Sequence, residues 1–375
     1  MYNRLIEPQL EQQFFKSKVV ILTGARQTGK TTLVKKILAE SAYRDSVRFF
    51  NCDNPTDRDA LNNQDLEFLK GLIGNAKLVF IDEGQKVETI GQTLKLLVDY
   101  YQDQKQILVT GSSSFKTSEA LTGRKFVFHL FPLSLEEIYS DKNMLTVLKE
   151  LPTHLVYGNY PEVAGLAAFA DKKRRLEELA ASYLYRDILE FQKIKSPTLL
   201  TNLLRALAWQ IGSEVSYTEL SSLLGIDKNT IERYVDILEK NYIVFRLSPY
   251  ATNKRKEISK LRKIYFFDVG IRNALINNFN PLEQRNDIGV LWENFILVER
   301  MKFRAYHEIT ANDYFWRTYG GAEIDLVEER EGQLFGYEFK WQDKKRRAAP
   351  SIHWRKYRNS TYEVIDPQKM PGFVW

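Results

Sequence analysis

Residues 24–32 read Gly24-Ala25-Arg26-Gln27-Thr28-Gly29-Lys30-Thr31-Thr32, directly after an apolar run, KVVILTG. The two glycines allow the backbone N–H groups of such a loop to turn inward toward phosphate oxygens, and a helix starting at the loop adds partial positive charge. Lys30 is then placed to reach the β- and γ-phosphates of ATP, and the Thr31 hydroxyl to coordinate Mg²⁺. The spacing GxxxxGK[ST] between an apolar strand and a helix therefore predicts a P-loop, with all nine residues in the nucleotide-binding segment.

Around this loop, short apolar runs alternate with helical patterns. The runs are KVVILTG (18–24), VRFFNCD (47–53), KLVFIDE (77–83), QILVTGS (106–112) and KFVFHLF (125–131). Four of the five are nearly continuous apolar segments of strand length, which is typical of strands buried on both faces of a sheet. The alternation predicts an α/β core, a parallel sheet with helices on both sides.

Further candidate catalytic residues follow these runs. Asp82 ends the third run and is expected to hold Mg²⁺ together with Thr31, while Glu83 is expected to polarise the attacking water as a general base. After the fourth run, Ser112 or Ser113 either senses the γ-phosphate or orients water, or else only caps a turn. Arg124 is either an ordinary surface arginine or a positive charge for the transferring phosphoryl group, supplied in cis or by a neighbouring subunit.

Composition limits the class of protein. A chain of 375 residues suggests roughly two or three domains. Its single cysteine, Cys52, cannot form an internal disulfide, and no apolar run is long enough for a membrane span, so a cytoplasmic protein without a membrane partner is expected. Residues 241–375 contain 23 Lys/Arg and 17 Asp/Glu, against 54 and 48 in the whole chain. The entire basic surplus is therefore C-terminal, which indicates either a nucleic-acid partner or a solvated basic face.

The middle of the chain has the pattern of a winged helix. Three helical segments, TLLTNLLRALAWQI, SYTELSSLLG and NTIERYVDILEKN, precede an apolar run at 242–250 that could form a wing. On the expected exposed face of the third helix, Glu232, Asp236 and Glu239 outnumber Lys228 and Arg233. Carboxylates facing phosphates are unfavourable, so both a DNA-reading module and a packing or protein-contact module stay open.

The C-terminal region contains a possible metal site. If a two-residue turn lies at Glu331-Gly332, Asp325 lies directly opposite Glu338, and Lys340 shares their face. Two carboxylates beside a lysine, with Glu293 as a fourth member, can bind Mg²⁺ and activate water. The alternative is a cross-strand ion pair on a solvated sheet. Two basic runs, 254–263 and 343–347, could follow a phosphate backbone.

The segments GARQTGKTT, LVFIDEGQKV, TGSSS, LTGR, LFPLSLEEI and YGNYPEV occur in this order, and together they resemble a family of prokaryotic AAA-type P-loop ATPases with a C-terminal region of unassigned function. The resemblance implies an ATPase core at 1–133, a helical lid at 134–195 and a winged-helix segment at 196–255. It also implies phosphate, metal and water-activating roles for Lys30, Thr31, Asp82 and Glu83. Ala25 replaces the family's usual proline, at a position that supplies only backbone.

The pattern Glu…Asp…Glu-x-Lys on helix, strand and strand resembles the PD-(D/E)xK superfamily of restriction-endonuclease-like folds. This implies a nuclease-like α/β domain at 256–375, with Ile324 in place of the motif's proline. The expected function is an ATP- and Mg²⁺-dependent ATPase whose nucleotide state is coupled to a nucleic-acid-binding domain, with or without nuclease activity. The alternative is a nucleotide switch or remodeller whose C-terminal half only docks protein or DNA. A second copy of the chain or a protein partner is also expected.

Overall fold

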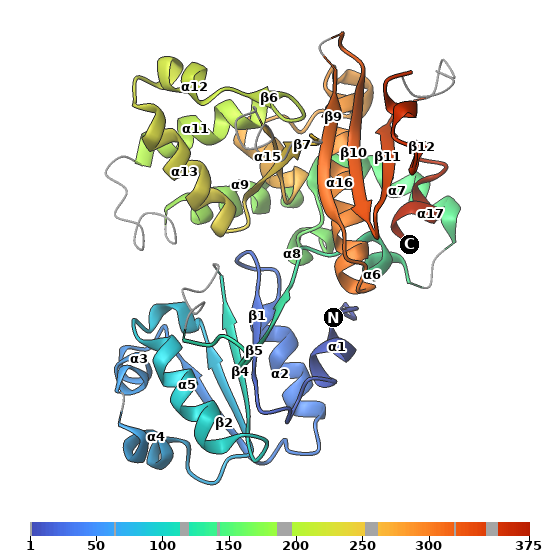
Figure 1. Ribbon diagram of the computed structural model, residues 1–375. Helices are drawn as coiled ribbons and strands as arrows, with labels where there is room; N and C mark the ends of the chain where they lie inside the picture. Colours follow the sequence, from blue (N-terminus) through green and yellow to red (C-terminus); the bar gives the residue numbers. More distant parts are fainter. Residues whose placement is uncertain are drawn as a thin grey trace. The chain divides into compact units, whose positions relative to one another are not determined.

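The computed structural model (Figure 1) describes residues 2–63, 65–112, 120–140, 143–185, 197–251, 262–318, 320–342 and 352–375. The chain forms two compact units, an N-terminal unit, Met1–Phe131, and a C-terminal unit, Pro132–Trp375. The boundary expected after residue 133 lies two residues beyond this division. None of the described helices is both long enough and apolar enough to cross a bilayer.

The N-terminal unit contains a five-stranded parallel sheet in the order β2-β3-β4-β1-β5. Its strands are β1 Val19–Thr23, β2 Val47–Asn51, β3 Leu78–Asp82, β4 Gln106–Gly111 and β5 Lys125–His129. Each lies in one of the five predicted runs, so the parallel α/β core is confirmed. The expectation of four fully buried strands was wrong, because only β1, β3 and β4 are buried along their whole length. The other two strands are the sheet edges, where Phe49 and Val127 are exposed.

Helices cover both faces of this sheet (Figure 1). They are α1 Glu7–Glu11, α2 Lys30–Glu40, α3 Pro55–Asn62, α4 Leu66–Ile73, the short 3₁₀ helix η1 Gly84–Lys86, and α5 Ile90–Tyr101. Along each buried strand alternate side chains point to opposite faces. Val79 and Ile81 accordingly pack in the cluster that contains α5 residues Leu94 and Leu97.

The C-terminal unit is built around a seven-stranded sheet in the order β12-β11-β10-β9-β7-β8-β6. Its strands are β6 Glu214–Val215, β7 Val244–Pro249, β8 Arg262–Phe266, β9 Asn312–Arg317, β10 Glu323–Arg330, β11 Gln333–Phe339 and β12 Ser360–Ile365. β7 pairs with β8 antiparallel and with β9 parallel. This pairing joins the segments 196–255 and 256–375, which were expected to be separate domains, in one continuous sheet.

The helices of the C-terminal unit surround this sheet. They are α6 Leu135–Tyr139, α7 Met144–Tyr157, α8 Pro161–Ala164, α9 Phe169–Tyr185, α11 Pro197–Trp209, α12 Tyr217–Leu224, α13 Lys228–Lys240, α15 Val269–Leu275, η2 Leu282–Gln284, α16 Ile288–Tyr306, η3 Trp354–Lys356 and α17 Met370–Val374. α7, α9 and α11 all contact α15. The segment expected as a lid of the ATPase core thus contributes its helices to the C-terminal unit.

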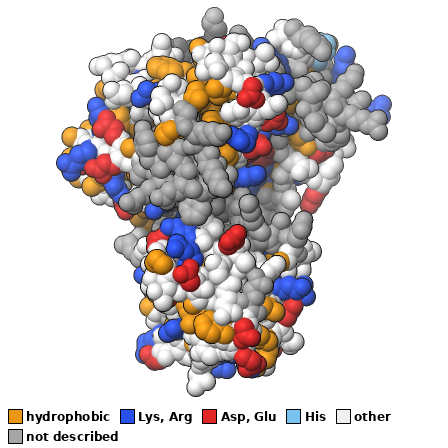
Figure 2. Space-filling model, turned by 90° about the vertical axis from the view of Figure 1, so that its left-hand side faces the viewer, with side chains coloured by type: hydrophobic (Ala, Val, Ile, Leu, Met, Phe, Trp, Pro, Cys, Tyr) orange, Lys and Arg blue, Asp and Glu red, His pale blue; other side chains and the backbone are white. Residues whose placement is uncertain are grey.

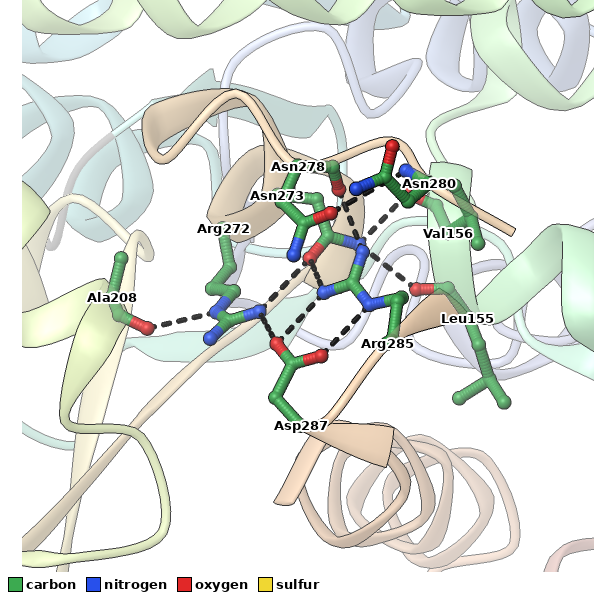
Figure 3. A network of polar contacts seen from close by, with 9 residues as sticks. All are labelled: Leu155, Val156, Ala208, Arg272, Asn273, Asn278, Asn280, Arg285 and Asp287. Atoms are coloured by element: carbon green, nitrogen blue, oxygen red, sulfur yellow. Dashed lines mark hydrogen bonds and ion pairs between the residues drawn. The ribbon is translucent and has the colours of Figure 1, made fainter. Parts of the chain in front are cut away.

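A buried polar network fixes α15 in place (Figure 3). It includes Arg272, Asn273, Arg285 and Asp287, with the backbone carbonyls of Leu155, Val156 and Ala208. Arg272 donates to the Ala208 carbonyl at 2.8 Å and to Asp287 at 2.5 Å. Burial opposes ionisation of Asp287, but hydrogen bonds from Arg285 and Arg272 outweigh it and lower the pKa of this carboxyl. One partly buried carboxylate therefore compensates two buried guanidinium groups.

Candidate functional site

The loop between β1 and α2 has the geometry that the sequence predicted. Gly24 has a φ of 150°, and a Cβ there would lie 2.2 Å from the carbonyl oxygen of Leu130. Only glycine fits this close approach. Gly29 caps α2 with a φ of 94°, and Gln27 also has a positive φ, of 59°. The predicted strand, loop and helix are thus confirmed as local structure.

Lys30 lies within this loop and is buried. Its Nζ donates to the carbonyl oxygens of Gly24 and Ala25 at 2.9 and 2.8 Å. The Thr28 hydroxyl also donates to Ala25, at 2.8 Å. Arg26 is half-buried, and Gln27 and Thr32 are exposed. The ammonium group is therefore held against the backbone that would surround a phosphate.

The hydroxyl of Thr31 donates to both carboxylate oxygens of Asp82, at 2.9 and 3.0 Å. The hydroxyl of Thr110 also donates to Asp82, an interaction that the sequence analysis did not anticipate. Asp82 is buried. Hydroxyl and carboxylate oxygens are the ligands that Mg²⁺ prefers, so these residues fit a magnesium ion.

Glu83 directly follows β3, and Ser112 directly follows β4. The side chain of Gln85 contacts both residues. The Gln85 Nε2 donates to Glu83 Oε2 at 2.5 Å and to Ser112 Oγ at 2.9 Å. Glu83 itself has a left-handed backbone, with φ 54° and ψ 40°. Gln85 was missed, although it lies in the quoted segment LVFIDEGQKV. Ser113 lies outside the described residues.

Two further residues next to the loop were missed. The guanidinium group of Arg4 is buried and donates to the carbonyls of Thr28 and Phe131, at 2.8 and 2.7 Å. A lone arginine far ahead of the motif gives no sequence signal for this role. Burial, and secondarily the charge of Lys30, lowers the pKa of His129 to about 3, so this imidazole is neutral at physiological pH.

Arg124 lies at the amino end of the parallel strands, whereas the P-loop lies at their carboxyl end. Its carbonyl accepts from Val19 N at 3.0 Å, beside the start of β1, whereas the P-loop follows the end of β1. The five residues of β1 separate these two ends of the sheet by about 16 Å. The guanidinium group of Arg124 pairs with Asp99 at 2.5 Å. The expected role in cis was therefore wrong, and a role in a neighbouring subunit stays a prediction.

In the C-terminal unit, the predicted hairpin register is confirmed. Glu331 and Gly332 both have positive φ, of 50° and 77°, as a two-residue turn requires. Leu326 pairs with Tyr337, and the same register places Asp325 beside Glu338. The sequence thus predicted the turn and the pairing from one dipeptide.

The carboxylates of this region nevertheless surround a lysine. The Lys263 side chain is 2% exposed and its Nζ lies 3.0 Å from Glu293 Oε1. It also pairs with Glu323, and Tyr265 donates to Glu293 Oε1 at 2.5 Å. Burial, followed by the charge of Glu293, raises the pKa of Asp325 to about 8, while Lys263 acts in the opposite direction. Lys263, expected in a run that follows a phosphate backbone, is instead a buried counter-ion.

Glu338 has partners of its own. Lys340 Nζ lies 2.8 Å from Glu338 Oε1, and Tyr362 donates to the other oxygen. The backbone N–H of Phe339 donates to Asp325 at 2.7 Å. Within the described ranges, no group of three or more His, Cys, Asp or Glu side chains could hold a metal ion. The hairpin register and the charge effects of Glu293 on Asp325 and of both carboxylates on Lys340 nevertheless bring the predicted residues together, and a Mg²⁺ site here stays a prediction.

The charges on α13 differ from the sequence count. Arg246 of β7 pairs with Asp236 at 2.7 Å, and its Nε donates to Glu239 at 2.8 Å. These two carboxylates are therefore already compensated within the unit. Three basic residues of α13 and one acidic residue are exposed, namely Lys228, Arg233, Lys240 and Glu232. The argument that this helix presents an acidic face was wrong.

The basic surplus of residues 241–375 is concentrated in two segments, 252–261 and 343–351. Each contains four Lys/Arg and one Asp/Glu, so together they hold the whole surplus. Both segments lie outside the described residues. On the face in Figure 2, the basic and acidic side chains that are coloured are interspersed. β7 and β11, which precede the two segments, run in the same direction and so end at the same edge of the sheet.

Comparison with known proteins supports the N-terminal assignment. Residues 16–139 match the family described as "AAA domain", while 148–282 and 288–365 match two domains of unknown function, DUF8612 and DUF4143. The uncharacterized protein Rv2008c of Mycobacterium tuberculosis is 29% identical over 350 residues, which cover 92% of this chain and 74% of that protein. An uncharacterized protein of Methanocaldococcus jannaschii is 26% identical over 339 residues, covering 80% and 74%.

Among solved structures, NtrX from Brucella abortus in complex with ATP is 14% identical, covering 64% of this chain and 68% of that one, with a TM-score of 0.27. At that score the likeness carries no argument. The family match and the P-loop geometry agree, however. Residues 16–139 match the AAA domain family, and the strand, loop and helix that contain Lys30 lie within this range.

Proposed function

We propose that the chain is a Mg²⁺-dependent ATPase whose nucleotide state controls a C-terminal unit that docks nucleic acid. The observation that carries the ATPase proposal is the contact of Thr31 with Asp82 beside Lys30 in the P-loop. These three residues, on two neighbouring elements, supply the phosphate contact and the metal ligands that phosphoryl transfer needs. Glu83 lies at the same edge of the sheet as a candidate base.

In this mechanism the Lys30 ammonium exchanges the carbonyls of Gly24 and Ala25 for phosphate oxygens when ATP binds. Thr31 and Asp82 would hold Mg²⁺, which would neutralise charge on the β- and γ-phosphates when bound. Glu83 accepts a proton from the attacking water while the water oxygen bonds to the γ-phosphorus. The bond from that phosphorus to the β–γ bridging oxygen breaks, and ADP and phosphate leave.

ATP hydrolysis and binding of a fluorescent ATP analogue test this proposal. We expect Lys30→Ala to lose nucleotide binding, because the phosphate charge is left uncompensated. Glu83→Gln should keep binding and reduce kcat by about 100-fold or more, which is the usual contribution of a general base. The exposed residues Lys95 and Glu88 provide matched controls as Lys95→Ala and Glu88→Gln. Equal loss of binding in Lys30→Ala and Glu83→Gln would contradict the assigned roles.

The course of the chain supports coupling between nucleotide and C-terminal unit. Leu130 lies against Gly24 of the P-loop, and a few residues later the chain is held inside the C-terminal unit. There, Leu133 N donates to the Asn159 carbonyl at 2.9 Å, and Lys302 donates to the Leu133 carbonyl at 2.8 Å. Only a few backbone bonds therefore lie between Leu130, which contacts the P-loop, and the buried hydrogen bonds of Leu133. A movement of the P-loop would reach these hydrogen bonds through that short segment.

For the C-terminal unit we favour docking of nucleic acid without metal-dependent cleavage. The engagement of Glu293 by Lys263 supports the absence of cleavage, and the exposed basic residues of α13 together with the basic segments 252–261 and 343–351 support a polyanionic partner. A non-catalytic module was one of the two functions that the sequence left open.

Binding to labelled single- and double-stranded DNA and RNA, followed by anisotropy at several salt concentrations with ATP or ADP, tests docking. Charge reversal of Lys254, Arg255 and Lys256 should weaken binding and reduce its salt dependence by about three charges. The change Glu363→Gln, at an exposed site on β12, serves as a control. Mg²⁺- or Mn²⁺-dependent cleavage that disappears in Asp325→Ala would replace docking by nuclease activity. Nucleotide-dependent capture of a defined protein without any nucleic-acid binding would support a protein-docking module instead.

A further inference from the structure

Gln85 occupies a position between the candidate base and the end of the neighbouring strand. It lies on η1, immediately after β3, and its Nε2 contacts two side chains at once, Glu83 Oε2 at 2.5 Å and Ser112 Oγ at 2.9 Å. Glu83 is one residue past the end of β3, and Ser112 one residue past the end of β4. A single amide group therefore links the ends of two adjacent parallel strands.

The orientation of this amide follows from its partners. A carboxylate can only accept a hydrogen bond, so the Gln85 atom that faces Glu83 must be the nitrogen. The amide oxygen, Oε1, then points elsewhere. It is buried and has no hydrogen-bond partner among the residues that the structure describes. An unpaired buried acceptor is costly, and a rearrangement on ATP binding that admits a water beside the candidate base would satisfy it.

The backbone around Gln85 keeps it in this position. Glu83 has a left-handed conformation, which directs the chain into η1. Lys86, the next residue, pairs with Asp53 after β2, and Glu83 N donates to the Thr110 hydroxyl at 3.4 Å. The turn that carries Gln85 is thus attached to neighbouring strands on both sides.

We propose that Gln85 is the positioning residue for ATP hydrolysis: its Nε2 orients the Glu83 carboxylate and the Ser112 hydroxyl, and its Oε1 accepts a hydrogen bond from the attacking water. The inference rests on the proposed ATPase function and extends it to a residue outside the P-loop and the Asp-Glu pair. With Glu83 taking one proton of the water and Oε1 accepting the other, the water oxygen is directed at the γ-phosphorus. Ser112 reports whether that phosphate is present.

Kinetics of Gln85→Ala and Gln85→Glu test this role. Gln85→Ala should lower kcat by about 10- to 100-fold, a fraction of the general-base contribution, and leave the KM for ATP within about twofold. Binding of the ATP analogue and the melting temperature should stay as in the wild type, which separates a positioning role from a structural one. Gln85→Glu places a second carboxylate against Glu83 and should lower kcat at least as much. Gln92→Ala, at an exposed site on α5, is the matched control.

The outcomes separate this inference from the ATPase proposal. If the wild type hydrolyses ATP and Glu83→Gln stops it, but Gln85→Ala keeps the wild-type kcat, the positioning role is wrong and the ATPase stands. If the wild type does not hydrolyse ATP at all, the proposed function fails first. A Gln85→Ala protein with a lower melting temperature, and with a loss of ATP-analogue binding that matches its loss of activity, would show a purely structural role and overturn the proposal.

Discussion

Replacement of Lys263 by methionine tests whether a lysine, rather than a metal ion, neutralises the carboxylates of the C-terminal unit. The substitution removes a buried positive charge and keeps a side chain of similar length. At the 3.0 Å separation from Glu293, two unit charges attract by about 5.5 kcal/mol at an effective dielectric constant near 20. Measured losses on removing one partner of a buried pair are about 3–5 kcal/mol. We expect the free energy of unfolding of this unit to fall by that amount at pH 8.

The loss should depend on pH with a definite sign. Burial raises the pKa of Asp325, so its stabilising contribution is complete below about pH 4, where the unfolded chain is also protonated, and disappears as the pH rises through about 8. Without Lys263 the pKa of this carboxyl rises further, because the cation that lowers it is gone. The difference in stability between Lys263→Met and wild type should therefore be larger at pH 8 than at pH 5.

Urea unfolding followed by tryptophan fluorescence measures this unit selectively, because all six tryptophans lie in the C-terminal unit. The double variant Lys263→Met/Glu293→Gln should recover part of the loss, since it removes the carboxylate left without its cation. Lys369→Met, at a half-exposed site, should cost at most about 0.5 kcal/mol. Stabilisation of the wild type by Mn²⁺ without nucleotide, abolished in Asp325→Asn, would refute the reasoning. So would an unchanged stability of Lys263→Met.

Three further predictions concern other parts of the molecule. Gly24→Ala should abolish binding of the ATP analogue, because the new Cβ would lie 2.2 Å from the Leu130 carbonyl oxygen. Normal binding by this variant would show that the loop relaxes easily. Gly71→Ala, with open space around the new Cβ, is the control. Arg124→Ala should change the ATPase rate of dilute protein by less than about twofold, given its place at the far edge of the sheet, and a larger loss there would restore a role within one chain. Asp287→Asn should cost about 3–5 kcal/mol in tryptophan-monitored unfolding, since two buried guanidinium groups lose their counter-ion. Because the pKa of Asp287 is lowered, the stabilisation that it provides should be present above about pH 4 and be lost as the pH falls below that value. A difference in unfolding free energy between the Asn variant and wild type that stays constant across this range would contradict the assignment.

The sequence predicted the local structure of the P-loop well because its parts are close together in the chain. The P-loop lies between one strand and one helix, and Asp82 with Glu83 ends another strand of the same parallel sheet, so the β-α alternation alone places them together. Gln85 and Arg4 were missed for different reasons. Gln85 acts through its side-chain bonds to Glu83 and Ser112, and Arg4 reaches the loop from a segment with no periodic pattern. Neither type of contact follows from spacing.

The C-terminal unit shows the opposite balance. A dipeptide with two positive φ values was enough to predict the register that pairs Asp325 with Glu338, because register is a property of the turn. The counter-ion was not predictable, because Lys263 comes from β8, which two other strands separate from β10 in the sheet. The Arg246 contacts that neutralise α13 depend in the same way on the return of β7 beside the helix.

A pattern of carboxylates is therefore an incomplete description of a metal site. Carboxylates form an ion pair when a lysine or arginine of the protein lies within contact distance of them. They bind a metal ion when no such side chain does, because a divalent ion must first lose bound water. In the N-terminal unit the partners of Asp82 are the hydroxyls of Thr31 and Thr110, neutral groups that leave its charge available to Mg²⁺. In the C-terminal unit the partners of Glu293 include a buried ammonium group. Under the proposed function we therefore expect the carboxylate at the end of β3 to bind a metal ion and the carboxylate on α16 to keep its lysine partner.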